Sequence, residues 1–125
     1  RAVHMQQPVA GPRWKVGATK IARHYRWSLT QAFSTFDKDS PGVIIVEDDL
    51  KFAPDFLEYI HAAAPILDQD STLWVVSAWN DNGFVHLVHD AKRLHRTDFM
   101  PGLGWLLPRV HWEQELEKKW PAMNR

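Results

Sequence analysis

The sequence contains no cysteine, which excludes both disulfide bonds and metal sites built from thiolates. It has no excess of charge either, because 15 basic residues balance 15 acidic ones and the formal net charge is zero. That balance gives no support to a nucleic acid as a partner. No stretch approaches the roughly 20 apolar residues of a transmembrane helix, and no signal peptide is visible.

Aromatic side chains, by contrast, are abundant: the 125 residues include seven tryptophans, six phenylalanines and two tyrosines. Burying such a side chain contributes roughly 1.5–3 kcal/mol, so most of them are expected in a core. The length suffices for one small domain with a core of its own. Because the chain opens on Arg1 rather than methionine and stops soon after Pro121, it is expected to be an internal fragment of a longer protein.

The spacing of apolar residues predicts helices and strands that alternate along the chain. Residues 1–12 have no periodicity and predict an irregular lead-in. Helices are predicted over residues 21–36, over 55–64, where Asp55 caps the first turn and Pro65 ends the helix, and over 110–119. Buried strands are predicted over 43–46 and 73–78, with short strands over 84–88 and 93–97. This alternation indicates the α/β class.

The most informative motif is an aliphatic run at 43–46 that leads directly into Glu47, Asp48 and Asp49. Such a run predicts a buried strand in a parallel sheet, and open α/β sheets bind ligands outside the carboxyl ends of their strands. Adjacent carboxylates repel one another. A hard divalent cation such as Mn²⁺ or Mg²⁺, itself bound to a phosphate, would neutralise them with oxygen ligands. The alternative is that these acids simply end the strand and cap the next helix.

The histidines give weaker signals. His24 lies between Arg23 and Arg26 in the helix before the acids, so it either contacts a nucleotide phosphate or is a histidine on a helix surface. His86 and His89 are three residues apart, but no acid or third histidine is spaced to complete a zinc site. Both are therefore expected to be surface residues.

Two loops carry residues suited to sugar binding. Residues 79–83 (WNDNG) follow the second strand as the acids follow the first, so the two segments are expected to face the same crevice. Asparagine and aspartate bind sugar hydroxyls, but they also form ordinary turns. Gly102 and Gly104 either let the backbone approach a ligand closely or form a tight turn. Trp105 either stacks under a sugar or belongs to the core.

Several long motifs occur in one order: IARHYRW at 21–27, VEDDL at 46–50, APDF at 53–56, SAWNDNG at 77–83, RTDF at 96–99 and PGLGWLL at 101–107. Together they resemble the N-acetylglucosaminyltransferase I family (alpha-1,3-mannosyl-glycoprotein 2-beta-N-acetylglucosaminyltransferases, glycosyltransferase family 13). The resemblance covers nearly all residues from 21 to 121. It implies an α/β, GT-A type, Rossmann-like domain that binds a nucleotide-sugar and Mn²⁺, with residues 1–125 forming a single partial domain that lacks its C-terminal remainder.

The resemblance also implies roles for individual residues. Asp49 matches the metal ligand of the family's Glu-Asp-Asp motif, and Asp48 matches a residue that contacts the donor nucleotide-sugar. Glu47 would hold hydroxyl groups of the sugar. His24 matches a histidine that binds the UDP part of the donor, and Leu103 would lie near the transferred sugar.

The reaction implied by the resemblance moves N-acetylglucosamine from UDP-N-acetylglucosamine to the 2-hydroxyl of a mannose, with inversion. The implied acceptor is a mannose-terminated N-glycan on a glycoprotein, and the implied location is the lumenal side of the Golgi membrane, with a membrane anchor upstream of Arg1. The family's catalytic base, an aspartate, follows a Lys-Trp-Pro segment that matches residues 119–121, so it is expected beyond Arg125. The chain alone is therefore expected to be inactive.

Other functions remain open at this point. The related O-mannose beta-1,2-N-acetylglucosaminyltransferases share the glycine turn and a similar Lys-Trp-Pro segment. A non-catalytic module that binds carbohydrate or nucleotide, with a structural ion at the acids, is an alternative from a different class. A purely structural interaction domain would explain neither the acids nor the ordered motifs.

Overall fold

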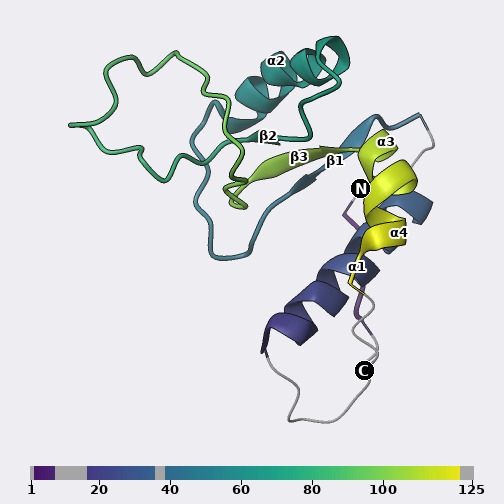
Figure 1. Ribbon diagram of the computed structural model, residues 1–125. Helices are drawn as coiled ribbons and strands as arrows, with labels where there is room; N and C mark the ends of the chain where they lie inside the picture. Colours follow the sequence, from purple (N-terminus) through teal and green to yellow (C-terminus); the bar gives the residue numbers. More distant parts are fainter. Residues whose placement is uncertain (1, 8–16, 36–38, 122–125) are drawn as a thin grey trace. The chain divides into compact units, whose positions relative to one another are not determined.

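The chain separates into two compact units in a computed structural model that describes residues 2–7, 17–35 and 39–121 (Figure 1). The first unit comprises Arg1–Pro41 with Arg109–Arg125, and the second unit comprises Gly42–Pro108. In the expected lead-in at 1–12, residues 2–7 are irregular as predicted, and residues 1 and 8–12 lie outside the described residues. Helices and a small sheet are both present, which confirms the mixed α/β class. None of the helices formed by the described residues is both long and apolar enough to cross a bilayer.

The first unit is helical. It contains α1 (Gly17–Thr35), α3 (Arg109–His111), the π-helical turn η1 (Trp112–Leu116) and α4 (Glu117–Lys119). The last three are continuous, so the predicted C-terminal helix is confirmed, with a π-helical turn at its centre. The core of the first unit is aromatic: Phe33 and Trp112 are buried, and their ring centroids lie 5.9 Å apart.

Arg109 anchors the C-terminal end of α1. Its Nη1 donates to the carbonyl oxygen of Phe33 at 3.1 Å and to Oε1 of Glu113 at 3.1 Å, and its Nε donates to the carbonyl oxygen of Ser40 at 3.0 Å. The last carbonyl groups of a helix have no intrahelical donor and carry partial negative charge. A guanidinium at this position therefore satisfies one of them.

The second unit consists of β1 (Gly42–Ile45), α2 (Phe56–Gln69), β2 (Val76–Ser77) and β3 (Trp105–Pro108). The sheet has the order β1-β3-β2, and both pairings are antiparallel. The predicted pairing as a parallel sheet is therefore wrong, because β3 inserts between the two predicted strands. β1 and β2 still run in the same direction, since each is antiparallel to β3.

Helix α2 packs on β2 and β3 and completes the core of the second unit. Ile60 and Ala63 of α2 and Trp105 and Leu107 of β3 are all buried, and Leu107 is fully so. Trp105 is thus a core residue, and the alternative in which it stacks under a sugar is wrong. Burial of these three aliphatic side chains and one aromatic side chain is the main force that holds this helix on the sheet.

Helix boundaries differ from prediction at α2. The helix does not end before Pro65 but continues through it to Gln69. Proline lacks the amide hydrogen that would bond to the carbonyl of the preceding turn. The helix persists because Ile60 and Ala63, in the turn before Pro65, are buried in the core. Asp55 occupies the N-cap position as predicted, yet its side chain makes no capping hydrogen bond.

Only two of the four predicted strands form, and β3 was not predicted. β1 begins and ends one residue earlier, and β2 contains only two of the six residues predicted at 73–78. Residues 84–88 form a turn, in which the amides of Leu87 and Val88 donate to the carbonyl oxygen of Phe84 at 2.8 and 2.9 Å. Residues 93–97 are likewise irregular. The chain between β2 and β3 is a long excursion without helix or strand, drawn in green in Figure 1.

Candidate functional site

Three loops leave the sheet at one edge, which is defined by Trp105. Ile45, the last residue of β1, and Ser77, the last residue of β2, both pair with Trp105, the first residue of β3. The acid turn (residues 47–49), the Asn/Asp loop (79–83) and the glycine turn (101–104) therefore all meet the sheet at this Trp105 edge. The acids and the Asn/Asp loop thus follow strand ends at the same edge, with β3 between those strands. That the two segments face one crevice stays a prediction.

The acid turn is tight and exposed. The amide of Leu50 donates to the carbonyl oxygen of Glu47 at 3.3 Å, which closes the turn. Glu47, Asp48 and Asp49 are all exposed, and the side chains of the two aspartates make no hydrogen bond or ion pair with the described residues. α2 begins only at Phe56. The alternative in which these acids cap the following helix is therefore wrong.

The acid turn suits a metal that brings other ligands with it. In the part of the chain that the structure describes, no group of three or more His, Cys, Asp or Glu side chains is arranged to hold a metal ion. Hard divalent cations such as Mg²⁺ are often held by one or two carboxylates, with phosphate oxygens of a substrate and water completing the coordination. The exposed carboxylate of Asp49 fits that type of site. It does not fit a cage made by the protein alone.

The glycine turn is a packed feature of the fold. Gly104 has φ +69°, a backbone conformation that other residues rarely adopt, and a Cβ atom there would lie 3.2 Å from the ring of Phe56. A Cβ atom on Gly102 would meet nothing within 4 Å. Gly104 is thus explained by the tight turn and its packing on α2, whereas Gly102 leaves open space beside Leu103. Leu103 is half-buried between them.

Hydrogen bonds attach both ends of the glycine turn to β2. The hydroxyl of Ser77 donates to the carbonyl oxygen of Pro101 at 2.7 Å, and the amide of Ala78 donates to the carbonyl oxygen of Gly104 at 2.8 Å. The hydroxyl of Tyr59 on α2 donates to the carbonyl oxygen of Ser77 at 2.7 Å. Burial raises the pKa of Tyr59, so its phenol stays protonated and remains a donor. Sequence reasoning missed Tyr59, since nothing local distinguishes it from any other aromatic residue of a helix.

The Asn/Asp loop is a closed turn with one fixed aromatic side chain. The amides of Asn82 and Gly83 donate to Oδ1 and to the carbonyl oxygen of Asn80, both at 2.9 Å, which is the pattern of an asparagine-stabilised turn. The indole Nε1 of Trp79 donates to Oδ1 of Asp81 at 2.9 Å. Trp79 is nevertheless 46% exposed.

His24 belongs to α1 in the first unit, whereas the acids belong to the second. Its ring is exposed; Nδ1 lies 3.0 Å from Oε1 of Gln7 and Nε2 lies 3.4 Å from Oγ of Ser28. The ring also stacks on Trp27, with centroids 6.2 Å apart. These contacts are those of a histidine on a helix surface, and a shared role of His24 and the acids in binding one donor stays a prediction.

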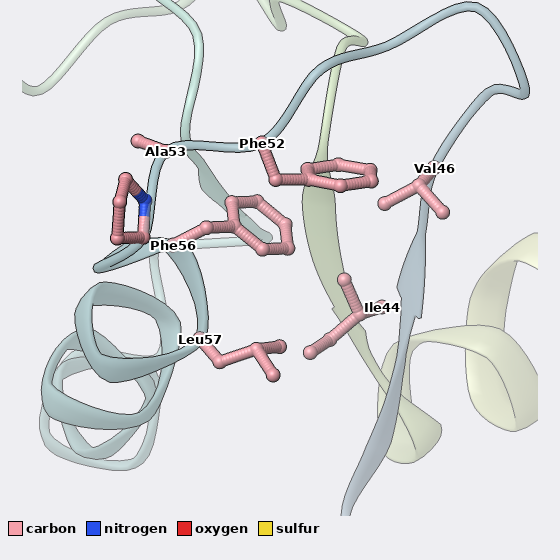
Figure 2. A pocket seen from close by; sticks show the side chains of 7 residues that line it. Ile44, Val46, Phe52, Ala53, Phe56 and Leu57 are labelled. Carbon is pink, nitrogen blue, oxygen red and sulfur yellow. The ribbon is translucent and has the colours of Figure 1, made fainter.

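An apolar hollow of about 440 Å³ lies beside the acid turn (Figure 2). It is lined by Ile44, Val46, Phe52, Ala53, Pro54, Phe56 and Leu57. The ring centroids of Phe52 and Phe56, which line one side of the hollow, lie 4.7 Å apart. Because the lining contains no charged or hydroxyl-bearing side chain, the hollow itself offers no group for polar chemistry. The polar groups of the site lie in the three loops of the Trp105 edge.

Comparison with known proteins gives one consistent result. The model of the GNT-I family matches residues 6–124. Among curated relatives, an alpha-1,3-mannosyl-glycoprotein 2-beta-N-acetylglucosaminyltransferase from Arabidopsis thaliana is 52% identical over 102 residues. The matched segment is 82% of this chain but only 22% of the relative, so the chain spans about a fifth of the relative's length.

Proposed function

The chain belongs to the GNT-I family, and from this premise we propose that it forms the metal- and donor-facing part of a glycosyltransferase. The proposed reaction moves N-acetylglucosamine from UDP-N-acetylglucosamine to the 2-hydroxyl of a mannose on an N-glycan of a glycoprotein. The anomeric configuration of the sugar is inverted. The relative is named for transfer of N-acetylglucosamine to mannosyl-glycoprotein, which supports both the transferred sugar and the acceptor.

The observation that carries the proposal is the meeting of the acid turn and the glycine turn at the Trp105 edge. A nucleotide-sugar presents a negatively charged diphosphate next to a neutral sugar ring. Exposed carboxylates that recruit a cation suit the diphosphate, and a glycine turn with open space at Gly102 suits close approach of a sugar. The paired ends of β1 and β3 bring these two surfaces to one side of the sheet.

Each candidate residue has a role in this proposal. Asp49 holds Mn²⁺, Asp48 contacts the donor, and Glu47 accepts hydrogen bonds from hydroxyls of the sugar. His24 binds the UDP part, and Leu103 lies against the transferred sugar. When bound, Mn²⁺ would act as a Lewis acid that stabilises negative charge on the leaving diphosphate. The acids of the turn orient the donor so that the face of the sugar opposite the diphosphate is open to the acceptor hydroxyl.

Inversion requires a base that takes the proton of the acceptor hydroxyl as it attacks. No residue of this chain is assigned to that step. We extend the proposal to the Golgi lumen as the place of action and to a membrane anchor in the parent protein. Both rest on the resemblance to the family.

A transfer assay tests the proposal. Protein made from the full reading frame would be incubated with UDP-N-acetylglucosamine, Mn²⁺ and either an oligomannose N-glycan or an O-mannosyl peptide, and the products weighed by mass spectrometry. We expect one N-acetylhexosamine on the N-glycan, lost with a chelator or with Asp49→Ala. Asp68→Ala, which removes an exposed aspartate of α2 far along the chain from the acid turn, is the matched control and should stay active.

Two outcomes would contradict the proposal. Transfer to the O-mannosyl peptide alone would assign the protein to the O-mannose enzymes, which share the glycine turn. Binding of UDP-N-acetylglucosamine and Mn²⁺ without any transfer would indicate a non-catalytic binding module.

A further inference from the structure

We propose that Trp79 and Asp81 form a subsite for a pyranose ring at the Trp105 edge. The indole would pack against the C–H face of the sugar, and the free oxygen of the carboxylate would accept hydrogen bonds from its hydroxyls. The inference rests on the proposed glycosyl transfer and adds a binding surface that none of the candidate residues above provides.

The indole of Trp79 is held in place although it is exposed. Its Nε1 donates to Oδ1 of Asp81 at 2.9 Å, and its backbone amide donates to Oγ of Ser77 at 3.2 Å. The polar atom of the indole is therefore satisfied within the loop. Trp79 as a whole residue is 46% exposed, whereas Trp105 and Trp112 are 5% and 2% exposed and belong to the cores. A large apolar ring that is fixed in orientation but not buried is pre-organised for a ligand.

Trp79 lies at the Trp105 edge of the sheet, where the proposed donor site also lies. Ala78, the residue before it, is hydrogen-bonded through its amide to the carbonyl oxygen of Gly104 at 2.8 Å. Trp79 therefore follows β2 next to the glycine turn. The last residue of β2, Ser77, pairs with Trp105, and so does Ile45, the last residue of β1 before the acids. The aromatic ring and the acid turn thus follow strand ends at one edge.

The chemistry of the pair matches a sugar. A pyranose ring has an apolar face of C–H groups and a rim of hydroxyls. The flat face of an indole gains dispersion energy and removes apolar area from water when it meets such a face. Oδ2 of Asp81 makes no hydrogen bond within the described residues, so it remains an acceptor at the border of the ring. Both the N-acetylglucosamine of the donor and the mannose of the acceptor have this chemistry.

The chain offers a matched control in Trp74. It is 45% exposed, almost the same as Trp79, and it precedes β2 whereas Trp79 follows it. The two side chains therefore leave opposite ends of the same strand. Loss of Trp74 removes a comparable exposed ring from the same unit without touching the Trp105 edge.

The test is steady-state kinetics of protein made from the full reading frame, with the KM for the donor and the KM for the N-glycan acceptor measured separately. Trp79→Ala is expected to raise one of the two KM values about tenfold, while Trp79→Phe, which keeps an aromatic face, raises it no more than about threefold. The substrate whose KM rises identifies the sugar that stacks. Trp74→Ala should leave both KM values within about twofold of the parent.

Asp81→Asn separates the two parts of the subsite. The amide keeps an oxygen that can accept from the indole Nε1 but removes the carboxylate charge that favours sugar hydroxyls. We expect a smaller rise, of about threefold, in the same KM that Trp79→Ala raises. Thermal melting of every variant would show that the fold is retained.

The inference would be overturned if Trp79→Ala and Trp74→Ala changed both KM values equally while transfer persisted, and the proposed function would then stand without it. If the parent transferred no sugar, the proposed function would be wrong, and the subsite would be judged by direct binding. In that case, saturation-transfer NMR with methyl mannoside and with methyl N-acetylglucosaminide should show contact that Trp79→Ala removes and Trp74→Ala retains. Contact with neither glycoside, or contact unaffected by Trp79→Ala, would overturn the subsite as well.

Discussion

The hydroxyl of Ser77 donates a 2.7 Å hydrogen bond to the carbonyl oxygen of Pro101, and so joins the end of β2 to the first residue of the glycine turn. The hydroxyl oxygen of Ser77 also accepts a hydrogen bond from the amide of Trp79 at 3.2 Å. A single hydroxyl therefore links two of the three loops at the Trp105 edge. Ser77 is half-buried, so water does not fully replace these hydrogen bonds when the hydroxyl is removed.

Ser77→Ala is predicted to loosen the glycine turn. We expect a loss of about 1 kcal/mol in the free energy of unfolding, because the Pro101 carbonyl loses its donor, and a rise in the KM for the donor that exceeds the change in kcat. Urea unfolding and steady-state kinetics of protein made from the full reading frame measure both. Ser71→Ala, at an exposed turn, is the control and should change neither. Equal behaviour of the two variants would contradict a role for the Ser77 hydroxyl.

The two glycines of the turn are predicted to respond differently to alanine. Gly104→Ala combines a positive φ of 69° with a Cβ atom 3.2 Å from the ring of Phe56, so we expect a loss of about 1–3 kcal/mol in the free energy of unfolding. Gly102→Ala meets nothing within 4 Å and should leave stability within about 0.5 kcal/mol of the parent. Urea unfolding measures both variants. A similar loss at both positions would show that the turn is not held as described.

Gly102→Ala has a second use because its stability is expected to be unchanged. If the open space beside Leu103 receives the transferred sugar, the added methyl group raises the KM for UDP-N-acetylglucosamine even though the protein is as stable as the parent. An unchanged KM would remove Gly102 from the donor surface and leave the glycine turn with a purely structural role.

The pH dependence of stability is predicted to involve Asp70. Hydrogen bonds from Thr72, and after them the charge and hydrogen bond of Arg96, hold the pKa of Asp70 below its ordinary value of 3.8. A group whose pKa is lower in the folded protein stabilises the fold above its unfolded pKa, and this contribution is lost as pH falls through the folded pKa. Stability due to Asp70 is therefore present at neutral pH and disappears below about pH 4.

The Asp70 prediction is checked by thermal melting between neutral pH and about pH 2.5. Asp70→Asn should melt at a lower temperature than the parent at neutral pH, and the difference should shrink as the pH falls through the acidic range. Asp68→Asn, at an exposed position two residues away, should follow the parent throughout. Because Arg96 reaches Asp70 from the long excursion before β3, with Nη1 3.1 Å from Oδ2, Arg96→Gln should reproduce part of the effect.

Local patterns in the sequence were sufficient for some elements and not for others. β1 and the position of the acids after it were predicted, within one residue, because the aliphatic run and the acids are adjacent in the chain. β3 and its place between β1 and β2 were not predicted. Trp105 pairs with Ile45 and with Ser77, which lie 60 and 28 residues earlier in the chain, and local patterns do not reveal such contacts. The end of α2 was missed for the same kind of reason, since burial of the helix outweighs the local effect of Pro65.

The roles of the two tryptophans illustrate the same limit. Both Trp79 and Trp105 follow a strand or a turn, and composition gives no reason to bury one rather than the other. The sheet decides, because Trp105 pairs on both sides and lies in the core while Trp79 is past the last paired residue of β2. The resemblance to the family supplied the candidate roles of the acids and of His24, and those roles remain predictions that require binding measurements.

The exposed acid turn predicts that Mn²⁺ stabilises the protein only when the donor is also bound. Since the described residues form no cluster that could cage a cation, Mn²⁺ alone should change the melting temperature little. UDP-N-acetylglucosamine and Mn²⁺ together should raise the melting temperature, since the diphosphate supplies metal ligands in addition to Asp49. With the donor at 100 times its Kd, binding should stabilise the folded protein by about 2.7 kcal/mol. Asp49→Ala should abolish the joint effect and Asp68→Ala should retain it. Full stabilisation by Mn²⁺ without the donor would mean that the protein builds the metal site by itself, and the proposed use of the acid turn would then be wrong.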